Sequence, residues 1–211
     1  MHNAQKNPPL RKSILMLLAL CGWFALAAQM KLNIGSKAAS LPEILTRYFS
    51  YFTLLTNLVV AVVCTSILLL PDSATGRFSA RYTTQTAATT YILIVGIVYN
   101  LVLRPLWKPT GLQKPVDELL HTIVPLLFLL QWIFFVKKNQ LPYKAILPWL
   151  LYPLIYVIFV LTRGSFSRFY PYPFIDLSKL SILQVFINSA GIAVAVIVVS
   201  ATLIFFGNRR T

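Results

Sequence analysis

Residues 182–206 read ILQVFINSAGIAVAVIVVSATLIFF and contain no charged side chain. About 20 predominantly apolar residues are enough for an α-helix to cross the hydrocarbon core of a bilayer. The stretch therefore predicts a membrane-spanning helix.

Five further apolar runs precede this stretch, at roughly residues 13–30, 48–70, 87–107, 119–136 and 145–161. Each is close to the length that a spanning helix needs. The six runs predict an all-α fold: a bundle of six transmembrane helices in a single membrane domain over residues 1–211. Pro125, Pro148 and Pro153 lie inside runs, where they predict kinks or freed carbonyl groups.

The first run has a second interpretation. It follows a basic start and ends near several alanines, which is also the pattern of a secretory signal peptide. We favour a retained first helix, because the run is long for a signal core and no soluble domain follows it for export.

The composition argues against an ordinary soluble domain and against nucleic acid as a partner. Hydrophobic residues make up 57% of the chain and charged residues 11%, whereas soluble domains carry about 25% charged residues. The formal net charge is +14, but the cations are spread between the apolar runs, so we expect membrane lipids as partners. Cys21 and Cys64 lack metal-ligand spacing and are predicted to be packing residues. We expect no metal and no cofactor, and the oligomeric state is left open.

Six crossings place both termini on one side of the membrane, which we call face A. Face A also holds the connections 72–86 and 137–144, and the other three connections form face B. Ten of the 19 Lys and Arg fall on face A and nine on face B, so the positive-inside rule barely decides the orientation. We expect cytoplasmic termini. The absence of an Asn-x-Ser/Thr motif favours a bacterial cytoplasmic membrane.

Polar side chains that are costly inside hydrocarbon gather near face B. Hydrogen bonds that merely join helices would be scattered through both leaflets, so this clustering predicts a site. Its members are Thr53, Thr56 and Asn57 in the second run, Asn100 in the third, Asp117 just before the fourth and His121 in it, and Tyr172 and Asp176 in the fifth connection.

Asp117 and His121 are four residues apart and so share one helical face. A carboxylate there can orient the imidazole and leave its other nitrogen as a base, which is the arrangement that nucleophilic catalysis uses. Each residue also has a simpler interpretation. Asp117 could stabilise a helix N-terminus, and a buried threonine usually bonds to its own helix. Asn57, Asn100 and Gln131 could join helices, and the tyrosines could form an interfacial belt.

The chain resembles the androgen-induced protein family, whose microbial branch is called Pr6Pr. The resemblance rests on Tyr51-Phe52-Thr53, Tyr99-Asn100-Leu101, Leu120-His121-Thr122 with Pro125, and Tyr172-Pro173-Phe174-Ile175-Asp176. It implies a multi-span threonine hydrolase that cleaves fatty-acid esters of hydroxy fatty acids. It also implies that Thr53 is the nucleophile and His121 the base. Because the spacing to Asn57 is one residue longer than in animal relatives, Thr56 is the alternative nucleophile.

The expected function is therefore an intramembrane lipid-ester hydrolase acting on fatty-acid esters of hydroxy fatty acids or similar lipids. Asp117 or Asp176 would orient the base, and Asn57, Asn100 or Tyr172 would donate to the developing oxyanion. The alternatives are a small-solute or proton-coupled transporter or channel, and a non-catalytic lipid-binding protein. The sequence shows no internal repeat of the kind that many transporters carry.

Overall fold

The computed structural model describes residues 8–136 and 141–209, and within these ranges it contains helices and no strand. Six segments of the described chain are long and apolar enough to cross a membrane. The predicted fold, an all-α membrane protein with six transmembrane helices, is confirmed.

Three of the six spans include more than one helical element, and short helices occur between spans. The spans are α1 (Pro9–Gly35); α3 (Phe52–Leu69); α5 (Tyr82–Val98) with η1 (Tyr99–Leu103) and η2 (Arg104–Leu106); α6 (Gln113–Glu118) with η3 (Leu119–Ile123) and α7 (Val124–Phe135); η4 (Tyr143–Ala145) with α8 (Ile146–Trp149) and α9 (Leu151–Ser167); and α10 (Ile182–Asn208). The short helices are α2 (Leu41–Tyr48), α4 (Ala74–Ala80) and η5 (Pro173–Ile175).

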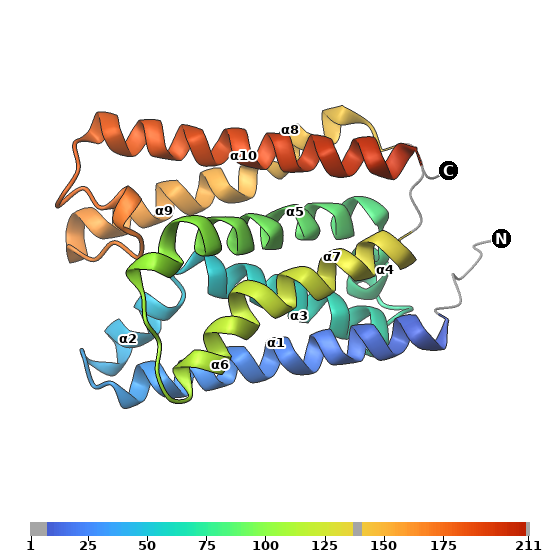
Figure 1. Ribbon diagram of the computed structural model, residues 1–211, viewed down its shortest axis with the longest axis horizontal. Coiled ribbons are helices and arrows are strands. Elements are labelled where there is room, and N and C mark those ends of the chain that lie inside the picture. The colour runs from blue at the N-terminus through green and yellow to red at the C-terminus, as the bar shows by residue number, and fades with distance from the viewer. Residues whose placement is uncertain (1–7, 137–140, 210–211) are drawn as a thin grey trace.

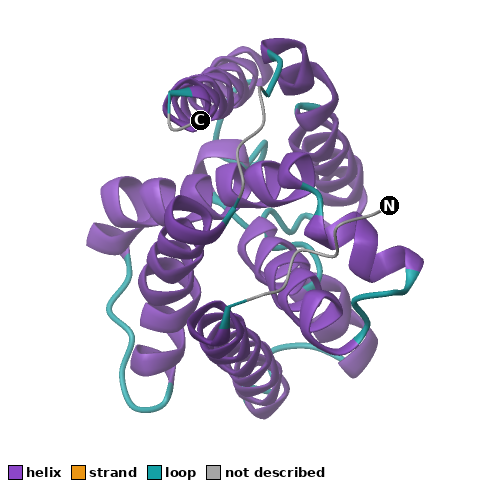
Figure 2. Ribbon diagram, turned by 90° about the vertical axis from the view of Figure 1, so that its right-hand side faces the viewer, coloured by secondary structure: helices purple, strands orange, loops and turns teal. Residues whose placement is uncertain are grey.

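The helices run alternately in opposite directions along the bundle (Figure 1). α1 begins and α10 ends at the right-hand end of the picture, which is therefore face A. At the opposite end lie α2, α6 and the connection between α9 and α10, which belong to face B. Figure 2 shows the same bundle from its right-hand end, with loops joining the helices. Four cations counted on face A, Lys6, Lys137, Lys138 and Arg210, lie outside the described residues.

The second apolar run is not one helix from residue 48 to 70. It contains the end of α2 and all of α3, and the helical structure is interrupted between them at residues 49–51. Pro42 stands in the first turn of α2, where a missing N–H does little harm. The break sets Thr53 at the very start of α3.

The fifth run is interrupted at its start and is longer than predicted. α8 ends at Trp149 and α9 begins at Leu151, close to Pro148 and Pro153, where helix hydrogen bonds are lost. α9 then continues to Ser167 instead of ending near residue 161, and it stops where Arg168 adopts a left-handed conformation with φ 57°.

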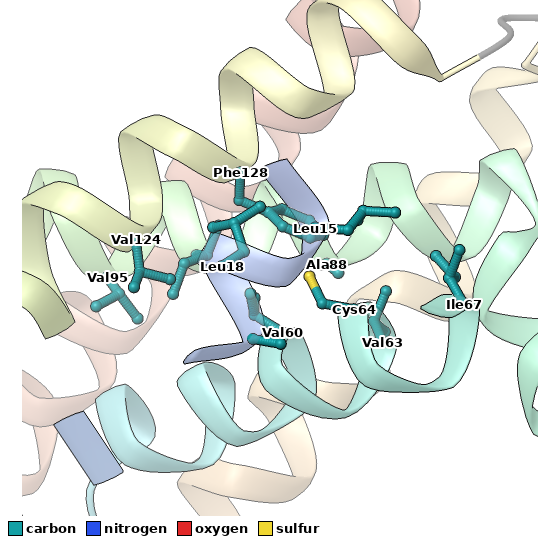
Figure 3. Packing of buried hydrophobic residues seen from close by; sticks show 12 residues of the cluster. Leu15, Leu18, Val60, Val63, Cys64, Ile67, Ala88, Val95, Val124 and Phe128 are labelled. Carbon is teal, nitrogen blue, oxygen red and sulfur yellow. The ribbon is translucent and has the colours of Figure 1, made fainter. Parts of the chain in front are cut away.

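The main core lies between α1, α3, α5 and α7. Leu15, Leu18, Val60 and Phe128 are fully buried there, and Cys64 packs among them as a free thiol (Figure 3). α9 and α10 pack against this core through separate apolar clusters that include Tyr156 and Val185. The site near face B therefore lies between a tightly packed group of helices and the outer pair α9 and α10.

Candidate active site

Two π-helical turns, η1 (Tyr99–Leu103) and η3 (Leu119–Ile123), contact each other near face B. In η3 the Val124 N–H donates to the carbonyl of Leu119, five residues back. Pro125 follows at once and cannot donate. π-helical turns are rare and occur frequently at functional sites, and these two carry two of the predicted site residues, Asn100 and His121.

Pro125 leaves carbonyl groups of η3 without a helical donor, and two asparagines bond to them. Asn57 Nδ2 donates to the carbonyl of Leu120 at 3.1 Å, and Asn100 Nδ2 donates to the carbonyl of His121 at 3.2 Å. Asn57 Nδ2 also donates to the Thr53 carbonyl at 2.9 Å, and Asn100 Nδ2 to the Gly96 carbonyl at 2.8 Å. Both amide groups therefore hold backbone in place, which is the role of helix-joining residues.

Gly96 permits this close approach of α5 to η3. A Cβ atom on Gly96 would lie 3.2 Å from the His121 carbonyl oxygen and 3.2 Å from the Cβ of Pro125. Both distances are shorter than ordinary van der Waals contact. The absence of a side chain at Gly96 lets the backbone that carries His121 pack directly on α5.

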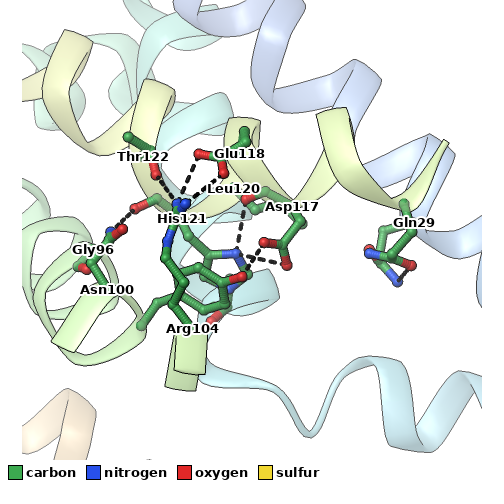
Figure 4. A network of polar contacts seen from close by, with 12 residues as sticks. Gln29, Gly96, Asn100, Arg104, Asp117, Glu118, Leu120, His121 and Thr122 are labelled. Atoms are coloured by element: carbon green, nitrogen blue, oxygen red, sulfur yellow. Dashed lines mark hydrogen bonds and ion pairs between the residues drawn. The ribbon is translucent and has the colours of Figure 1, made fainter. Parts of the chain in front are cut away.

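His121 is held from two sides. Its Nδ1 lies 2.9 Å from the Asp117 carbonyl oxygen and 3.4 Å from Asp117 Oδ1 (Figure 4). The Tyr99 ring stacks on the imidazole with centroids 3.8 Å apart and planes inclined by 16°. The Tyr99 hydroxyl in turn donates to Asp117 Oδ2. The imidazole is therefore fixed in position and orientation before any ligand binds.

The hydrogen bonding also assigns the tautomer of His121. A carbonyl oxygen can only accept, so the hydrogen of the neutral ring lies on Nδ1. The lone pair then lies on Nε2, which has no hydrogen-bond partner among the described residues. In this tautomer Nε2 is the nitrogen that can accept a proton, as a general base must.

An ion pair lies beside this unit. Arg104 Nη1 lies 2.8 Å from Glu118 Oε1, and Arg104 Nη2 donates to Thr122 Oγ1 at 3.0 Å. The guanidinium also lies 5.3 Å from the centre of the Tyr99 ring. Because both ionic groups are about two-fifths exposed, their pairing adds little to stability. Its main effect is to join η2 to α6 and, through Thr122, to η3.

Thr53 is the second residue of α3 and is 7% exposed. Its N–H donates to the Tyr172 hydroxyl at 3.2 Å, and its Oγ1 lies 3.3 Å from the same hydroxyl. The first N–H groups of a helix have no helical partner, so the connection between α9 and α10 supplies one. Tyr172 is buried, and burial raises the pKa of its hydroxyl to about 12, so it is a neutral donor at ordinary pH.

Thr56 lies one turn deeper in the same helix and has another environment. Its Oγ1 is 3.1 Å from the Tyr152 hydroxyl on α9. Thr56 is fully buried and is not among the described residues that line a cavity near His121. Of the two predicted nucleophiles, Thr53 is therefore the one that faces the same space as His121.

That space is an open cavity of about 570 Å³ lined by residues of α1, α3, η1, α6, η3 and the connection between α9 and α10. Ligand pockets are typically of this size. Its polar residues include Thr53, Asp117, His121, Tyr99 and Tyr172. Gln29 and Gln113, which hydrogen-bond to each other at 2.7 Å, also contribute to the wall. Asn57, Asn100 and Asp176 are not among the described residues that line it.

Asp176 does not reach His121. Its Oδ1 accepts from the Ser178 N–H at 3.0 Å and from Ser178 Oγ at 2.5 Å, and its Oδ2 lies 3.5 Å from Lys179 Nζ. Partial burial raises the pKa of this carboxyl, but the Ser178 and Lys179 contacts outweigh it and hold the pKa below the usual range. Asp176 therefore shapes the turn that leads into α10, and Asp117 is the carboxylate beside the imidazole.

An interfacial belt is the simpler interpretation of the tyrosines, Tyr99 included, but the Tyr99 ring is buried and stacks on His121. The signal that pointed to it was the Tyr99-Asn100-Leu101 motif. Gln29 was not expected, since nothing in the first apolar run marks it as facing a cavity. Among the described residues, no three His, Cys, Asp or Glu gather where they could hold a metal ion.

Comparison with known families, curated proteins and solved structures found no match for this chain. The fold and the site therefore define its class: a six-span α-helical membrane protein with a partly polar cavity near one membrane face.

Proposed function

We propose that this protein is an intramembrane lipid-ester hydrolase with Thr53 as nucleophile and His121 as general base, and that it belongs to the androgen-induced protein family it resembles. The expected substrates are fatty-acid esters of hydroxy fatty acids or similar lipids. One observation carries the proposal: Thr53, His121 and Tyr172 come from two spans and a connection to line one cavity close to face B.

Acylation starts at Thr53. His121 Nε2 takes the hydroxyl proton as Thr53 Oγ1 attacks the ester carbonyl carbon, and the pair of electrons of the carbonyl bond moves to its oxygen. Asp117 accepts from Nδ1–H, keeps the ring in the required tautomer and stabilises the imidazolium that forms. Tyr99 holds the ring plane by stacking.

The tetrahedral intermediate then collapses and the threonine ester is hydrolysed. His121 gives its Nε2 proton to the leaving alcohol oxygen, which leaves an acyl group on Thr53. A water molecule attacks that acyl group with His121 again as base, and the fatty acid and free Thr53 are released. The Tyr172 hydroxyl, 3.3 Å from Thr53 Oγ1, is placed to donate to the oxyanion in both halves.

Thr53 and His121 are not hydrogen-bonded to each other in the described structure. Proton transfer requires His121 Nε2 to reach Thr53 Oγ1 directly or through one water, and such contacts often tighten only when substrate binds. The cavity has room for both a water and an ester group.

The test uses purified protein in detergent micelles with an ester of a hydroxy fatty acid, and mass spectrometry of the released acid. Thr53→Val and His121→Gln should each lower cleavage by at least ~10²-fold, since a general base contributes at least that much. Thr56→Val is the matched control, because Thr56 is in the same helix, carries the same side chain and faces Tyr152. It should cleave at nearly the wild-type rate.

A threonine-reactive phosphonate ester gives an independent measurement. Peptide mass spectrometry should find the label on Thr53 and lose it in the Thr53→Val and His121→Gln variants. Labelling of Thr56 instead would identify Thr56, one helical turn deeper in α3, as the nucleophile. No cleavage of any ester together with solute flux in proteoliposomes would instead support a transporter.

A further inference from the structure

A second cavity, narrow and mostly apolar, opens beside the active-site cavity. It is about 60 Å³ in volume and lies between α3, α5, α9, α10 and the connection before α10. Its walls include Ile94, Pro153, Ile192 and Val196. It contains no ionisable carboxylate or cation among the described residues.

The two cavities meet at the proposed nucleophile. Thr53, Tyr99, Leu103 and Tyr172 line both of them. His121 and Asp117 line only the larger one within the described chain. Thr53 therefore stands at a junction, with the proposed base on one side and an apolar cleft on the other.

The narrow cavity leads from Thr53 toward the middle of the membrane. On α10 it extends from Ser189 to Val196, seven residues or ~10 Å of helix, and on α5 and η1 from Leu103 back to Ile94, nine residues or ~13 Å. Both helices give a similar depth. Ile94, Pro153 and Val196, from three different helices, lie furthest from face B and form its floor.

The chemistry of this cavity fits a single hydrocarbon chain. A narrow space between helices admits one chain, whose contacts with the apolar walls replace those that it makes with lipid. The Ser189 hydroxyl oxygen is buried without a hydrogen-bond partner among the described residues. The polar groups of a lipid headgroup in this cavity would, like the Ser189 hydroxyl, find no hydrogen-bond partner on the apolar walls, and this disfavours a headgroup there.

We propose that the narrow cavity holds the acyl chain of the ester, and that its floor at Val196 selects the acyl group by length. This inference rests on the proposed hydrolase function. The hydroxy-acid half of the substrate then lies in the larger cavity, beside Gln29, His121 and Gln113, from which it leaves as the alcohol. Specificity is accordingly strict for the acyl half and permissive for the alcohol half.

The experiment measures hydrolysis of a series of p-nitrophenyl esters from acetate to palmitate. Val196→Phe raises the floor and should lower the kcat/KM ratio of long to short esters roughly tenfold, because one methylene that does not fit a hydrophobic pocket costs at least about that factor. Val194→Phe is the matched control: the same substitution on the same helix, at a side chain that is 58% exposed. It should leave the chain-length profile unchanged.

Overpacking at Val196 could prevent folding, so Ile192→Phe, at a half-buried residue of the same wall, is the second variant. A folded Val196→Phe or Ile192→Phe enzyme with the wild-type chain-length profile would overturn the inference. So would a length preference that changes equally in Val194→Phe.

Binding separates this inference from the hydrolase proposal. A fatty-acid ester with a diazirine near the end of its acyl chain is photolysed in the Thr53→Val protein, and the labelled peptide is mapped. Label on α10 near Val196 supports the acyl cavity even if the wild type cleaves no ester, which would refute the hydrolase alone. Label confined to the lipid-facing surface refutes the acyl cavity whatever the enzymatic result.

Discussion

Replacing Asn57 by leucine should destabilise the fold without slowing ester cleavage per folded molecule. The substitution removes the donor to the Leu120 carbonyl, which Pro125 cannot replace. Orphaning a buried carbonyl costs about 1–3 kcal/mol, whereas hydrogen bonds between membrane helices average about 0.6 kcal/mol. The second bond of the Asn57 amide, to the Thr53 carbonyl within α3, adds little, because that carbonyl is already part of the helix. The buried Asn57 Oδ1 has no hydrogen-bond partner among the described residues, so its removal costs nothing. We therefore expect a net loss of about 1–2 kcal/mol.

A double-mutant cycle with Pro125→Ala tests the reason for this cost. Alanine restores an N–H five residues beyond Leu120, so it can donate to the carbonyl that Asn57 now serves. In the Pro125→Ala background, Asn57→Leu should cost less than about 0.5 kcal/mol, a difference that a double-mutant cycle resolves. The free energy is measured by reversible unfolding in mixed detergent micelles containing SDS, followed by tryptophan fluorescence.

Two results would refute this reasoning. An equal cost of Asn57→Leu in both backgrounds would mean that Leu120 is not the group that matters. A fall in cleavage of ~10²-fold or more at unchanged stability would make Asn57 an oxyanion donor, as one interpretation of the sequence held.

Three further outcomes are expected. Gly96→Val should cost about 1–3 kcal/mol by pushing α5 off η3, while Gly191→Val, where a Cβ meets nothing within 4 Å, should be nearly neutral in the same unfolding assay. Tyr99→Phe keeps the stacked ring but loses the bond to Asp117, so kcat should fall about tenfold with little change in KM, and the pH–rate profile should shift. Burial raises the pKa of Tyr172 to about 12, so its contribution to stability is complete below pH 10 and is lost as the pH rises through 12. The measurement is the difference between the ultraviolet titration curves of the wild type and of Tyr172→Phe. Tyrosinate formation near pH 10 in this difference would contradict the expectation.

The number of spans and their order could be predicted because each apolar run is close to the thickness of the membrane. The ends of the helices could not be predicted, because hydropathy carries no information on where the backbone hydrogen bonding changes. The break at residues 49–51 lies at the edge of an apolar run, and α9 continues past residue 161 into Thr162 and Arg163. Arg163 Nη2 lies 2.8 Å from Glu43 Oε1 of α2, a contact between distant parts of the chain that hydropathy cannot predict.

The candidate site was predictable as a set of polar residues at one depth, but not as a division of roles. Sequence spacing put Asp117 beside His121, because residues four apart meet on any helix. It could not tell that Asn57 and Asn100 bond to the backbone, because their acceptors were created by Pro125 and the π-helical turn. Nor could it separate Thr53 from Thr56, since their difference depends on which one meets Tyr172 and which meets Tyr152.

The π-helical turn at Leu119–Ile123 holds one amino acid more than the α-helical winding it replaces. The surplus residue is absorbed locally, so the helix before it and the helix after it keep the faces they turn toward α1 and α5. Removing a single amino acid within the turn should therefore spare the bundle while withdrawing the imidazole from the cavity. A one-residue insertion or deletion in this turn can thus change the position of His121 while the packing of the helix bundle stays the same.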